Sequence, residues 1–516
     1  MSMVDSNTVL SSNPGATPDL DVAIIGGGIS GLVTAHRLAK RGDLGRHASV
    51  RIFEASDRVG GLVQTEMRGA WLFETGPDSM LTAKVSACAL CRELGLGDEL
   101  VAPRSGATFS LVHDRRLHPL PAGFRMIAPT QAWPLLRSQL FSGPGKIRML
   151  LEPWIPRGVS GSVGDELAQD ETVKSFVVRR FGQEAFDRVA EPLLGGLFVA
   201  DAAKLSARRA LGPMVEFELR NGSVLRGLRT SSINSARDSA HKSGPPAPTQ
   251  LTLKHGLGSL IRRLVEEIPA SWLQLGCAAK AIRPLREQQG WQIESTSGKC
   301  TAREVVLACP APRCHDLLRD TVPAVADALK ELHFTSCVTV NLVYRRNDLK
   351  ELPSDFGFFV PRSEPYRILA ASFASEKFPD RAPDEHVVVR TYHGGALDPE
   401  ALDLDDAELI ERAHHDLAQL IGAGALPLSS LVSRFRESMP QFDVGHLDRV
   451  AELRCQISPI RGLHVVGSAM GAYGLPDCVE SAEEVSLGIE LYRRHTGVAS
   501  QGESSHSSRT GGASAG

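Results

Sequence analysis

The chain has 516 residues, 42% of them hydrophobic, which is enough for two or more domains with separate cores. Its 57 basic and 60 acidic side chains give a formal net charge of -3, so the composition argues against a nucleic-acid partner. Nine cysteines spread thinly through a long chain are unlike a secreted disulfide framework and favour a reducing, cytoplasmic compartment.

Both ends of the chain are rich in Ser and Gly and poor in large apolar side chains. Residues 1–18 and 497–516 are therefore predicted to be disordered. The N-terminus lacks the basic region and apolar core of a secretory signal. No run of residues reaches the roughly 18 apolar positions of a membrane span.

A strand, a glycine turn and a helix follow one another near the N-terminus. Residues 21–25 form a buried-strand pattern, a GxGxxG turn follows at once, and helical spacing continues to residue 39. The first glycine permits the tight turn, the second lets the backbone approach a pyrophosphate, and the third lets the helix pack on the strand. The helix N-terminus then faces the phosphates. The dinucleotide-binding residues predicted here are Gly26, Gly28, Ile29, Ser30 and Gly31.

A second strand pattern at residues 50–53 ends in Glu54. This acid comes 23 residues after Gly31, where Rossmann-like domains carry the carboxylate that accepts the ribose hydroxyls. NAD and FAD share this arrangement, so the residues up to Glu54 fit either dinucleotide.

The run after Glu54 completes an ExxxRxGG pattern, which resembles the flavin amine-oxidase superfamily. The resemblance implies FAD, with the Arg and the glycine pair along its diphosphate. "ETGPDSM" at residues 74–80 resembles the segment in which a Gly-Pro pair passes close to the flavin ring, and "GCAAKAI" at residues 276–282 resembles the segment whose backbone contacts the adenine. These similarities add Ala55, Arg58, Gly60, Gly61, Gly76, Pro77 and Ala279 to the predicted cofactor site.

Near the C-terminus, an apolar strand is followed by a glycine-bearing loop and a helix. We expect Asp477 to open that helix, with Glu480 at capping-box spacing. The positive end of such a helix would favour the negative charge of a reduced flavin, whereas a capped surface helix is the alternative. The cofactor residues predicted here are Gly467, Gly474, Asp477, Cys478 and Val479.

Five further runs resemble the protoporphyrinogen and coproporphyrinogen oxidases of haem biosynthesis: "GGLFVADAAKLS", "LKHGLGSL", "DFGFFVP", "MPQFDVGH" and "YGLPDCVES". The resemblance implies a six-electron oxidation of protoporphyrinogen IX or coproporphyrinogen III, by hydride transfer to flavin N5, with O2 reduced to H2O2. The flavin drives such chemistry, so neither a catalytic side chain nor a metal is required. The alternatives are an amine oxidase, a carotenoid desaturase, or a non-catalytic flavin-binding partner in the haem pathway.

The substrate walls expected from the resemblance are aromatic and apolar. Their alternative is ordinary packing within a β core. Many relatives carry a basic residue, poised to pair with a substrate propionate, where this chain has Phe109. Arg115 and Arg116 lie nearby on a predicted hairpin turn, where solvated charges are the alternative to propionate pairing. Propionate recognition therefore stays open. The predicted substrate residues are Phe109, Phe356, Gly357, Phe359 and Tyr392.

The alternation of strands and helices predicts an α/β protein: a doubly wound, Rossmann-like FAD domain interleaved with a mixed-sheet substrate domain and a helical subdomain. Residues 121–155 fit a helix pair lying on a membrane face or, equally, packing within the helical subdomain. A homodimer is a further option. The expected segments are 19–100, 251–325 and 446–496 for FAD binding, 101–250 for the helical subdomain with a flexible insertion near 228–250, and 326–445 for the substrate sheet.

Overall fold

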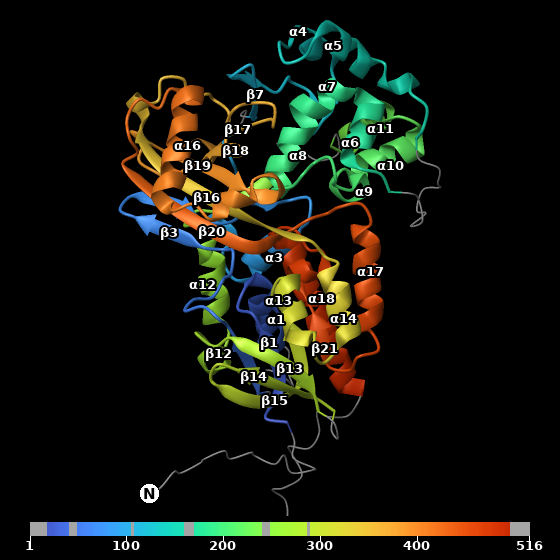
Figure 1. The fold of residues 1–516 in the computed structure, drawn as a ribbon, viewed down its shortest axis with the longest axis vertical. Coiled ribbons are helices and arrows are strands. Elements are labelled where there is room, and N and C mark those ends of the chain that lie inside the picture. Colours follow the sequence, from blue (N-terminus) through green and yellow to red (C-terminus); the bar gives the residue numbers. More distant parts are fainter. Residues whose placement is uncertain are drawn as a thin grey trace, which may run out of the picture.

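The protein has three parts, which Figure 1 shows as a lower α/β domain, an upper sheet with its covering helix, and an upper helical subdomain. The computed structural model describes residues 18–40, 49–104, 108–158, 170–239, 248–285 and 289–495. Of the residues predicted to be disordered, 1–17 and 497–516 lie outside these ranges. No helix in the described ranges is long and apolar enough to cross a bilayer.

The lower domain is built on a seven-stranded sheet with the order β12-β2-β1-β15-β14-β13, in which β21 also pairs with β15. β1 lies between β2 and β15 and is parallel to both. We call this the cofactor domain. Its strands are β1 (Leu20–Ile25), β2 (Val50–Phe53), β12 (Leu273–Gln274), β13 (Ala279–Pro284), β14 (Trp291–Ser295), β15 (Gly298–Leu307) and β21 (Leu463–Val465).

Helices cover both faces of this sheet, which explains why β1 is continuously apolar from Val22 to Ile25. Val22 and Ile24 pack into one core beneath the first helix, whereas Ala23 and Ile25 pack into the core on the opposite face. The helices on the first face are α1 (Ile29–Lys40), α3 (Ser86–Glu93), α12 (Gly258–Glu266) and α18 (Leu475–His495), and those on the second are α13 (Ala311–Leu318), α14 (Pro323–Lys330) and α17 (His446–Ile457). The predicted doubly wound domain is therefore confirmed.

The upper sheet also has seven strands, in the order β20-β16-β19-β18-β17-β7-β8. Its strands are mainly antiparallel, but β17 and β7 are parallel, so the predicted mixed sheet is confirmed. α16 (Asp406–Ile421) covers one face and begins with a capping box formed by Asp405 and Glu408. The strands are β7 (Ser110–His113), β8 (Arg116–Pro119), β16 (Phe334–Arg345), β17 (Gly357–Phe359), β18 (Ala370–Phe373), β19 (His386–Gly394) and β20 (Ser429–Pro440), with α15 (Ala374–Lys377) after β18.

The helical subdomain lies beside the upper sheet and above the cofactor domain (Figure 1). It has one core of Leu, Val, Phe and Ala side chains, which includes a fully buried ion pair between Arg180 and Glu152. Its elements are α4 (Ala132–Arg137), α5 (Gly143–Leu150), α6 (Val173–Phe181), α7 (Gln183–Ala185), a π-helical turn η3 (Phe186–Ala190), α8 (Glu191–Phe198), α9 (Ala207–Ala210), α10 (Gly212–Asn221) and α11 (Val224–Ser239). The helical character predicted for residues 171–217 is confirmed.

Short strand pairs connect these parts. β3 (Thr65–Arg68) pairs with β4 (Trp71–Glu74), β9 (Phe124–Arg125) pairs with β10 (Ala128–Pro129), and β11 (Gln250–Leu253) joins β5 (Met80–Leu81) to β6 (Leu100–Val101). The pairing of β11 brings residues from mid-chain back to the cofactor domain.

The flexible insertion predicted near residues 228–250 is helical over its first part, because α11 continues to Ser239. The helix is fixed at its start: Ser223 Oγ accepts from the backbone N–H of Arg226 at 3.1 Å, and Glu152 accepts from the N–H groups of Val224 and Leu225. Residues 240–247 of the predicted insertion lie outside the described ranges.

Candidate functional site

The glycine turn after β1 is held too tightly for any side chain at two of its positions. Gly26 has φ +111°, and a Cβ there would lie 2.7 Å from the carbonyl oxygen of Ala308. At Gly31 a Cβ would collide with the carbonyl oxygen of Gly26. The turn therefore requires glycine at both positions, as the sequence predicts.

Gly28 differs from these two, because a Cβ at this position would meet no protein atom within 4 Å. The space beside it is therefore open on the side where a Cβ would lie. On another side the glycine turn contacts the second glycine pair, Gly60 and Gly61: Gly60 N–H donates to Gly27 O at 2.8 Å, and Gly28 and Gly60 form a parallel bridge. Gly61 approaches the Gly28 Cα so closely that a Cβ on Gly61 would lie 3.2 Å from it. The result is a cradle of backbone with room for a phosphate group at the start of α1.

Glu54 lies at the end of β2, directly beside this cradle. Its Oε2 accepts from Gly27 N–H at 2.7 Å, and its Oε1 accepts from the backbone N–H and hydroxyl of Ser56 at 2.8 and 2.7 Å. Arg58 is exposed, and its Nη2 donates to Gly61 O at 3.0 Å. The structure thus brings the predicted acid, the predicted arginine and both glycine pairs together.

The predicted adenine segment also reaches this end of the domain. Gly276 N–H donates to Ser56 O at 2.7 Å, and Cys277 N–H donates to Glu54 O at 2.8 Å. Ala279 follows as the first residue of β13, and its buried carbonyl accepts from Arg313 at 2.7 Å. The segment is therefore adjacent to Glu54, although the Ala279 carbonyl already has a partner.

The C-terminal motif meets the first helix at Gly467. A Cβ at Gly467, whose φ is +75°, would lie 2.6 Å from Ser30 Oγ, and Ser30 Oγ donates to Cys478 O at 3.4 Å. Val479 is fully buried against α1, and burial raises the pKa of the Cys478 thiol to about 11. Segments more than 400 residues apart in sequence therefore form one end of the site.

The start of α18 differs from the prediction. The helix begins at Leu475, so Asp477 is its third residue rather than its N-cap. Asp477 Oδ2 instead accepts from the backbone N–H of Tyr473 at 3.1 Å, and its Oδ1 lies 2.6 Å from Lys84 Nζ. Pro476, in the first turn, is the sequence signal for the earlier start, because proline is tolerated there.

Residues 74–77 pass between the cofactor domain and the upper sheet. Glu74 is buried, accepts from Leu257 N–H at 2.7 Å and from Thr65 Oγ1 at 2.8 Å, and thereby holds the start of α12. Burial raises its pKa to about 7, against the lowering effect of these hydrogen bonds. A Cβ at Gly76 would collide with Leu62 O, so the following Pro77 is held close to the glycine cradle.

The upper sheet contacts this segment with a row of polar side chains. Thr339 Oγ1 donates to Thr75 O at 2.8 Å, and Arg390 donates to Gly76 O at 2.6 Å. Arg390 also donates to the Tyr392 hydroxyl, and its guanidinium lies 4.8 Å from the centre of that ring. The sheet face that carries Tyr392 is therefore turned toward the predicted flavin segment.

Asp78 completes this cluster. Lys377 Nζ lies 3.1 Å from its carboxylate, and Arg390 Nη2 lies 3.8 Å away. Burial alone would raise the pKa of Asp78, but the two cations outweigh burial and hold the pKa below its usual range. The sequence analysis missed this cluster; the polar Arg390, two residues before Tyr392 in an apolar strand, was the available signal.

Phe109 and Phe359, two of the predicted substrate residues, pack against each other and form a feature that we call the aromatic wall. Their rings meet edge to face with centroids 5.2 Å apart, and a Cβ at Gly196 of α8 would lie 2.6 Å from the Phe359 ring. Strand pairing places Phe359, Ala370 and Tyr392 in one row across the sheet. Three of the predicted substrate residues thus share this side of the sheet.

The other two predicted substrate residues lie at the edge of this wall. Gly357 packs so tightly against Ala371 O that a Cβ would collide with it. Phe356 precedes β17, is half-buried, and donates its backbone N–H to Thr108 O at 2.9 Å. Its side chain has no ring contact with Phe109, Phe359 or Tyr392 among the described residues.

A second aromatic cluster, which the sequence analysis missed, joins α8 to the loop before α18. Phe198, Phe442 and Tyr473 have ring centroids 4.9 to 5.6 Å apart, and the Tyr473 hydroxyl donates to Leu197 O. Leu197 itself is 48% exposed. The cluster continues the apolar surface from the upper sheet toward the C-terminal motif.

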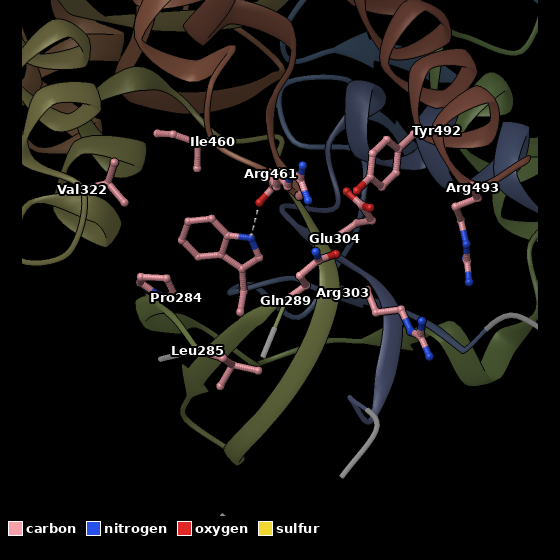
Figure 2. Close-up of a pocket in the computed structure, with 13 residues that line it drawn as sticks. Pro284, Leu285, Gln289, Arg303, Glu304, Val322, Ile460, Arg461, Tyr492 and Arg493 are labelled. Carbon is pink, nitrogen blue, oxygen red and sulfur yellow. Dashed lines mark hydrogen bonds between the residues drawn. The ribbon is translucent and has the colours of Figure 1, made fainter. Parts of the chain in front are cut away.

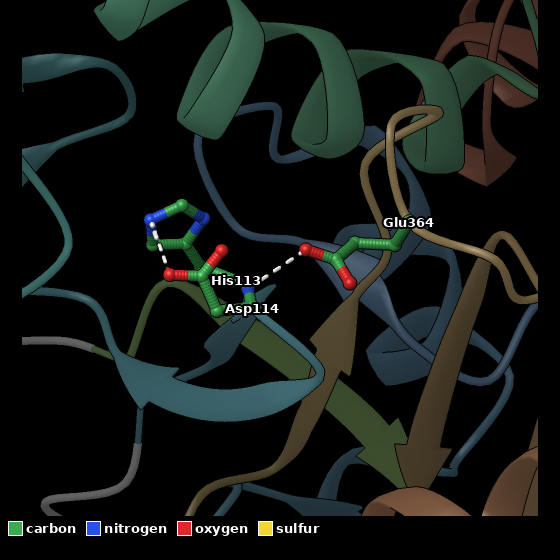
Figure 3. A group of neighbouring side chains, drawn as sticks. All are labelled: His113, Asp114 and Glu364. Atoms are coloured by element: carbon green, nitrogen blue, oxygen red, sulfur yellow. Dashed lines mark hydrogen bonds and ion pairs between the residues drawn. The ribbon is translucent and has the colours of Figure 1, made fainter.

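Two other groupings lie outside this site. A cavity of about 390 Å³ at the outer end of the cofactor sheet is lined by none of the predicted site residues (Figure 2). His113, Asp114 and Glu364 lie close together at the β7–β8 hairpin, where Glu364 accepts from the N–H groups of Asp114 and Arg115 at 2.9 and 3.1 Å (Figure 3). Asp114 and Arg115 have positive φ values, so Glu364 stabilises this strained turn.

A doubly wound domain with an open glycine cradle, lying beneath a second sheet with an aromatic wall, defines a dinucleotide-dependent oxidoreductase. Residues 29–487 match the family described as flavin containing amine oxidoreductase. The chain belongs to this family, and FAD is its cofactor.

Three similar proteins indicate the branch of the family. Coproporphyrinogen III oxidase from Bacillus subtilis (strain 168) is 30% identical over 467 residues, covering 90% of this chain and 96% of that protein. Coproporphyrinogen III oxidase from Propionibacterium freudenreichii subsp. freudenreichii is 32% identical over 487 residues and covers 89% of each chain. A crystal structure described as that of a protoporphyrinogen oxidase from Exiguobacterium sp. 255-15 is 27% identical, with a TM-score of 0.80, covering 92% of this chain and 100% of that chain.

Proposed function

We propose that this chain is an FAD-dependent, oxygen-dependent porphyrinogen oxidase of haem biosynthesis. The observation that carries the proposal is the convergence, beneath the aromatic wall of the upper sheet, of the open cradle at Gly28, the Gly76–Pro77 segment and the start of α18. Relatives that match nearly the whole chain and are named for porphyrinogen substrates support it.

The proposed cofactor contacts follow the length of an FAD molecule. The cradle and the start of α1 would hold the diphosphate, Glu54 the ribose, and the residues of β13 the adenine. The Gly76–Pro77 segment and the first turn of α18 would hold the flavin. The proposed residues are Gly26, Gly28, Ile29, Ser30, Gly31, Glu54, Ala55, Arg58, Gly60, Gly61, Gly76, Pro77, Ala279, Gly467, Gly474, Asp477, Cys478 and Val479.

The proposed substrate contacts are apolar because a porphyrinogen is a broad macrocycle that must be oriented and kept from water. Phe359 and Phe109 would pack against it, and Tyr392 would face it from β19. Gly357 would contribute by letting β17 pack closely on β18. Phe356, which lies at the edge of the aromatic wall, is also a proposed substrate contact. When bound, FAD accepts a hydride from the macrocycle, and O2 takes up the electrons, so one porphyrinogen and three O2 give one porphyrin and three H2O2.

An anaerobic titration tests this proposal. The purified protein should show a flavin spectrum, and either protoporphyrinogen IX or coproporphyrinogen III should bleach it. In air, porphyrin fluorescence should then rise with the preferred substrate, which decides between the two. A flavoprotein that neither porphyrinogen bleaches would refute the proposed activity.

We also propose that the outer side of α4, α5 and the 3-10 turn η2 (Glu152–Trp154) contacts a membrane surface. Trp133 and Trp154 are 63% and 71% exposed, and Ile147 is 59% exposed. Arg137 stacks on the Trp133 ring at 4.6 Å, so a cationic group lies beside an exposed aromatic ring, as is common at a bilayer interface.

Vesicle co-sedimentation tests this contact. The protein should pellet with vesicles that contain anionic lipid, and Trp133→Ser together with Trp154→Ser should abolish binding. Leu426→Ser, at a residue that is 77% exposed between α16 and β20, is the matched control and should bind as wild type does. Equal binding by all three proteins would contradict the proposed surface.

A further inference from the structure

Arg209 reaches from the helical subdomain to the C-terminal motif. It lies on α9, where its backbone N–H is capped by Ser206 Oγ at 3.0 Å. Its guanidinium lies 4.2 Å from the centre of the Phe442 ring, and its Nη2 donates to Gly471 O at 3.2 Å. The same Nη2 lies 3.7 Å from Asp477 Oδ2. All of these side-chain partners belong to the last 75 residues of the chain, so Arg209 ties the two parts together.

Asp477 stands between two cations of unequal exposure. Lys84 approaches Oδ1, but its side chain is 56% exposed, whereas the side chain of Arg209 is 24% exposed. Water and salt screen the exposed lysine far more than the arginine. Burial lowers the pKa of Arg209, and the carboxylate of Asp477 opposes that effect; an arginine nevertheless stays charged at neutral pH.

The ion pair between Arg209 and Asp477 lies at the N-terminus of α18, because this helix begins at Leu475. A carboxylate at the third residue of a helix offsets the positive charge of the helix N-terminus. Arg209 offsets that carboxylate in turn, and its bond to Gly471 O fixes the loop that leads into the helix. Without Arg209, the solvated Lys84 and the Tyr473 N–H group would remain as partners of Asp477, and the first turn of α18 would become more negative.

We propose that Arg209 is a positioning residue that fixes Asp477 and the loop before α18 and thereby sets the reduction potential of the bound flavin. This inference rests on the proposed function, in which the first turn of α18 faces the flavin. A reduced flavin carries negative charge at its N1–C2 edge, so a nearby cation stabilises the reduced form more than the oxidised form. Loss of Arg209 should therefore make the midpoint potential more negative.

The experiment compares midpoint potentials of FAD-loaded proteins by dye-coupled reductive titration. Arg209→Gln keeps hydrogen-bonding capacity but removes the charge, and it should shift the potential to a more negative value. Arg209→Lys keeps the charge and should stay close to wild type. Arg220→Gln is the control, because Arg220 is an exposed residue of α10 that pairs with Glu216 in the same subdomain. Thermal melting confirms that each variant is folded.

A second variant tests the sign of the effect and does not depend on the folding of Arg209→Gln. Asp477→Asn removes the carboxylate and leaves both cations, so its potential should become more positive. An unchanged potential in folded Arg209→Gln, an equal shift in Arg209→Lys, or a negative shift in Asp477→Asn would each overturn the inference. A wild-type protein that binds no FAD would instead defeat the proposed function, so the two failures are distinguishable.

Discussion

Gly28→Ala should weaken FAD binding without destabilising the folded apoprotein. The added methyl meets no protein atom within 4 Å, and Gly28 does not have a positive φ, so the apoprotein should fold normally. The methyl does occupy the cradle in which we place the diphosphate, and it would push a phosphate away from the N–H groups of Ile29 and Ser30. A hydrogen bond to a charged group contributes about 1.5–3 kcal/mol, so the loss of two such bonds costs at least about 3 kcal/mol. This corresponds to a Kd for FAD that is roughly 150-fold higher.

Two measurements check this expectation. The ratio of flavin to protein absorbance in the purified protein should fall sharply, and titration of the apoprotein with FAD, followed by flavin fluorescence, should give the raised Kd. Gly488→Ala is the matched control, because it adds the same methyl in open space on α18 and should stabilise that helix by about 0.5–1 kcal/mol. Wild-type FAD affinity in Gly28→Ala would refute the placement of the diphosphate.

Three other substitutions test the substrate wall, the buried ion pair and the pH dependence of stability. Gly196→Ala should slow porphyrinogen oxidation without loss of bound flavin, because its methyl would press on the Phe359 ring; an unchanged rate would argue against this wall. Glu152→Ala should lower the free energy of unfolding in urea by about 3 kcal/mol, because it removes a carboxylate 3.0 Å from the fully buried Arg180, and a loss below about 1 kcal/mol would contradict that account. Burial lowers the pKa of His36 from 6.5 to about 4, so the unfolded chain binds the proton first, and the stability of the wild type should fall as pH drops from about 6.5 to 4. His36→Leu should lose less stability over this pH range. Identical profiles of the free energy of unfolding against pH for the two proteins would refute the role of His36.

The sequence predicted the cofactor domain well because its signals are local. A buried strand, a glycine turn, a helix and an acid after the next strand each depend on near neighbours, and the structure places Gly26, Gly31 and Glu54 as that pattern requires. The sequence did not predict the second half of α11, which lies in the segment expected to be a flexible insertion. Glu152, some 70 residues earlier, accepts from the first N–H groups of that helix, and no local pattern reports such a partner.

The remaining differences also come from partners that are distant in sequence. Asp477 has capping-box spacing, yet the helix begins two residues earlier, and the carboxylate lies between Lys84 and Arg209. Phe356 and Phe359 belong to one short motif, but only Phe359 lies against Phe109. Side chains alternate across a strand, so residues close in sequence can face different surroundings.

By itself, the sequence determined the doubly wound domain and the glycine turn, because backbone conformation and hydrophobic periodicity are properties of short segments. Family resemblance in its separate motifs indicated FAD and a porphyrinogen. Only the tertiary structure decided that Arg390 contacts both Asp78 and the Tyr392 hydroxyl, and that Arg209 reaches Asp477. Such contacts depend on how the three parts of the protein pack together, and the free energy of an ion pair depends on the burial that this packing creates.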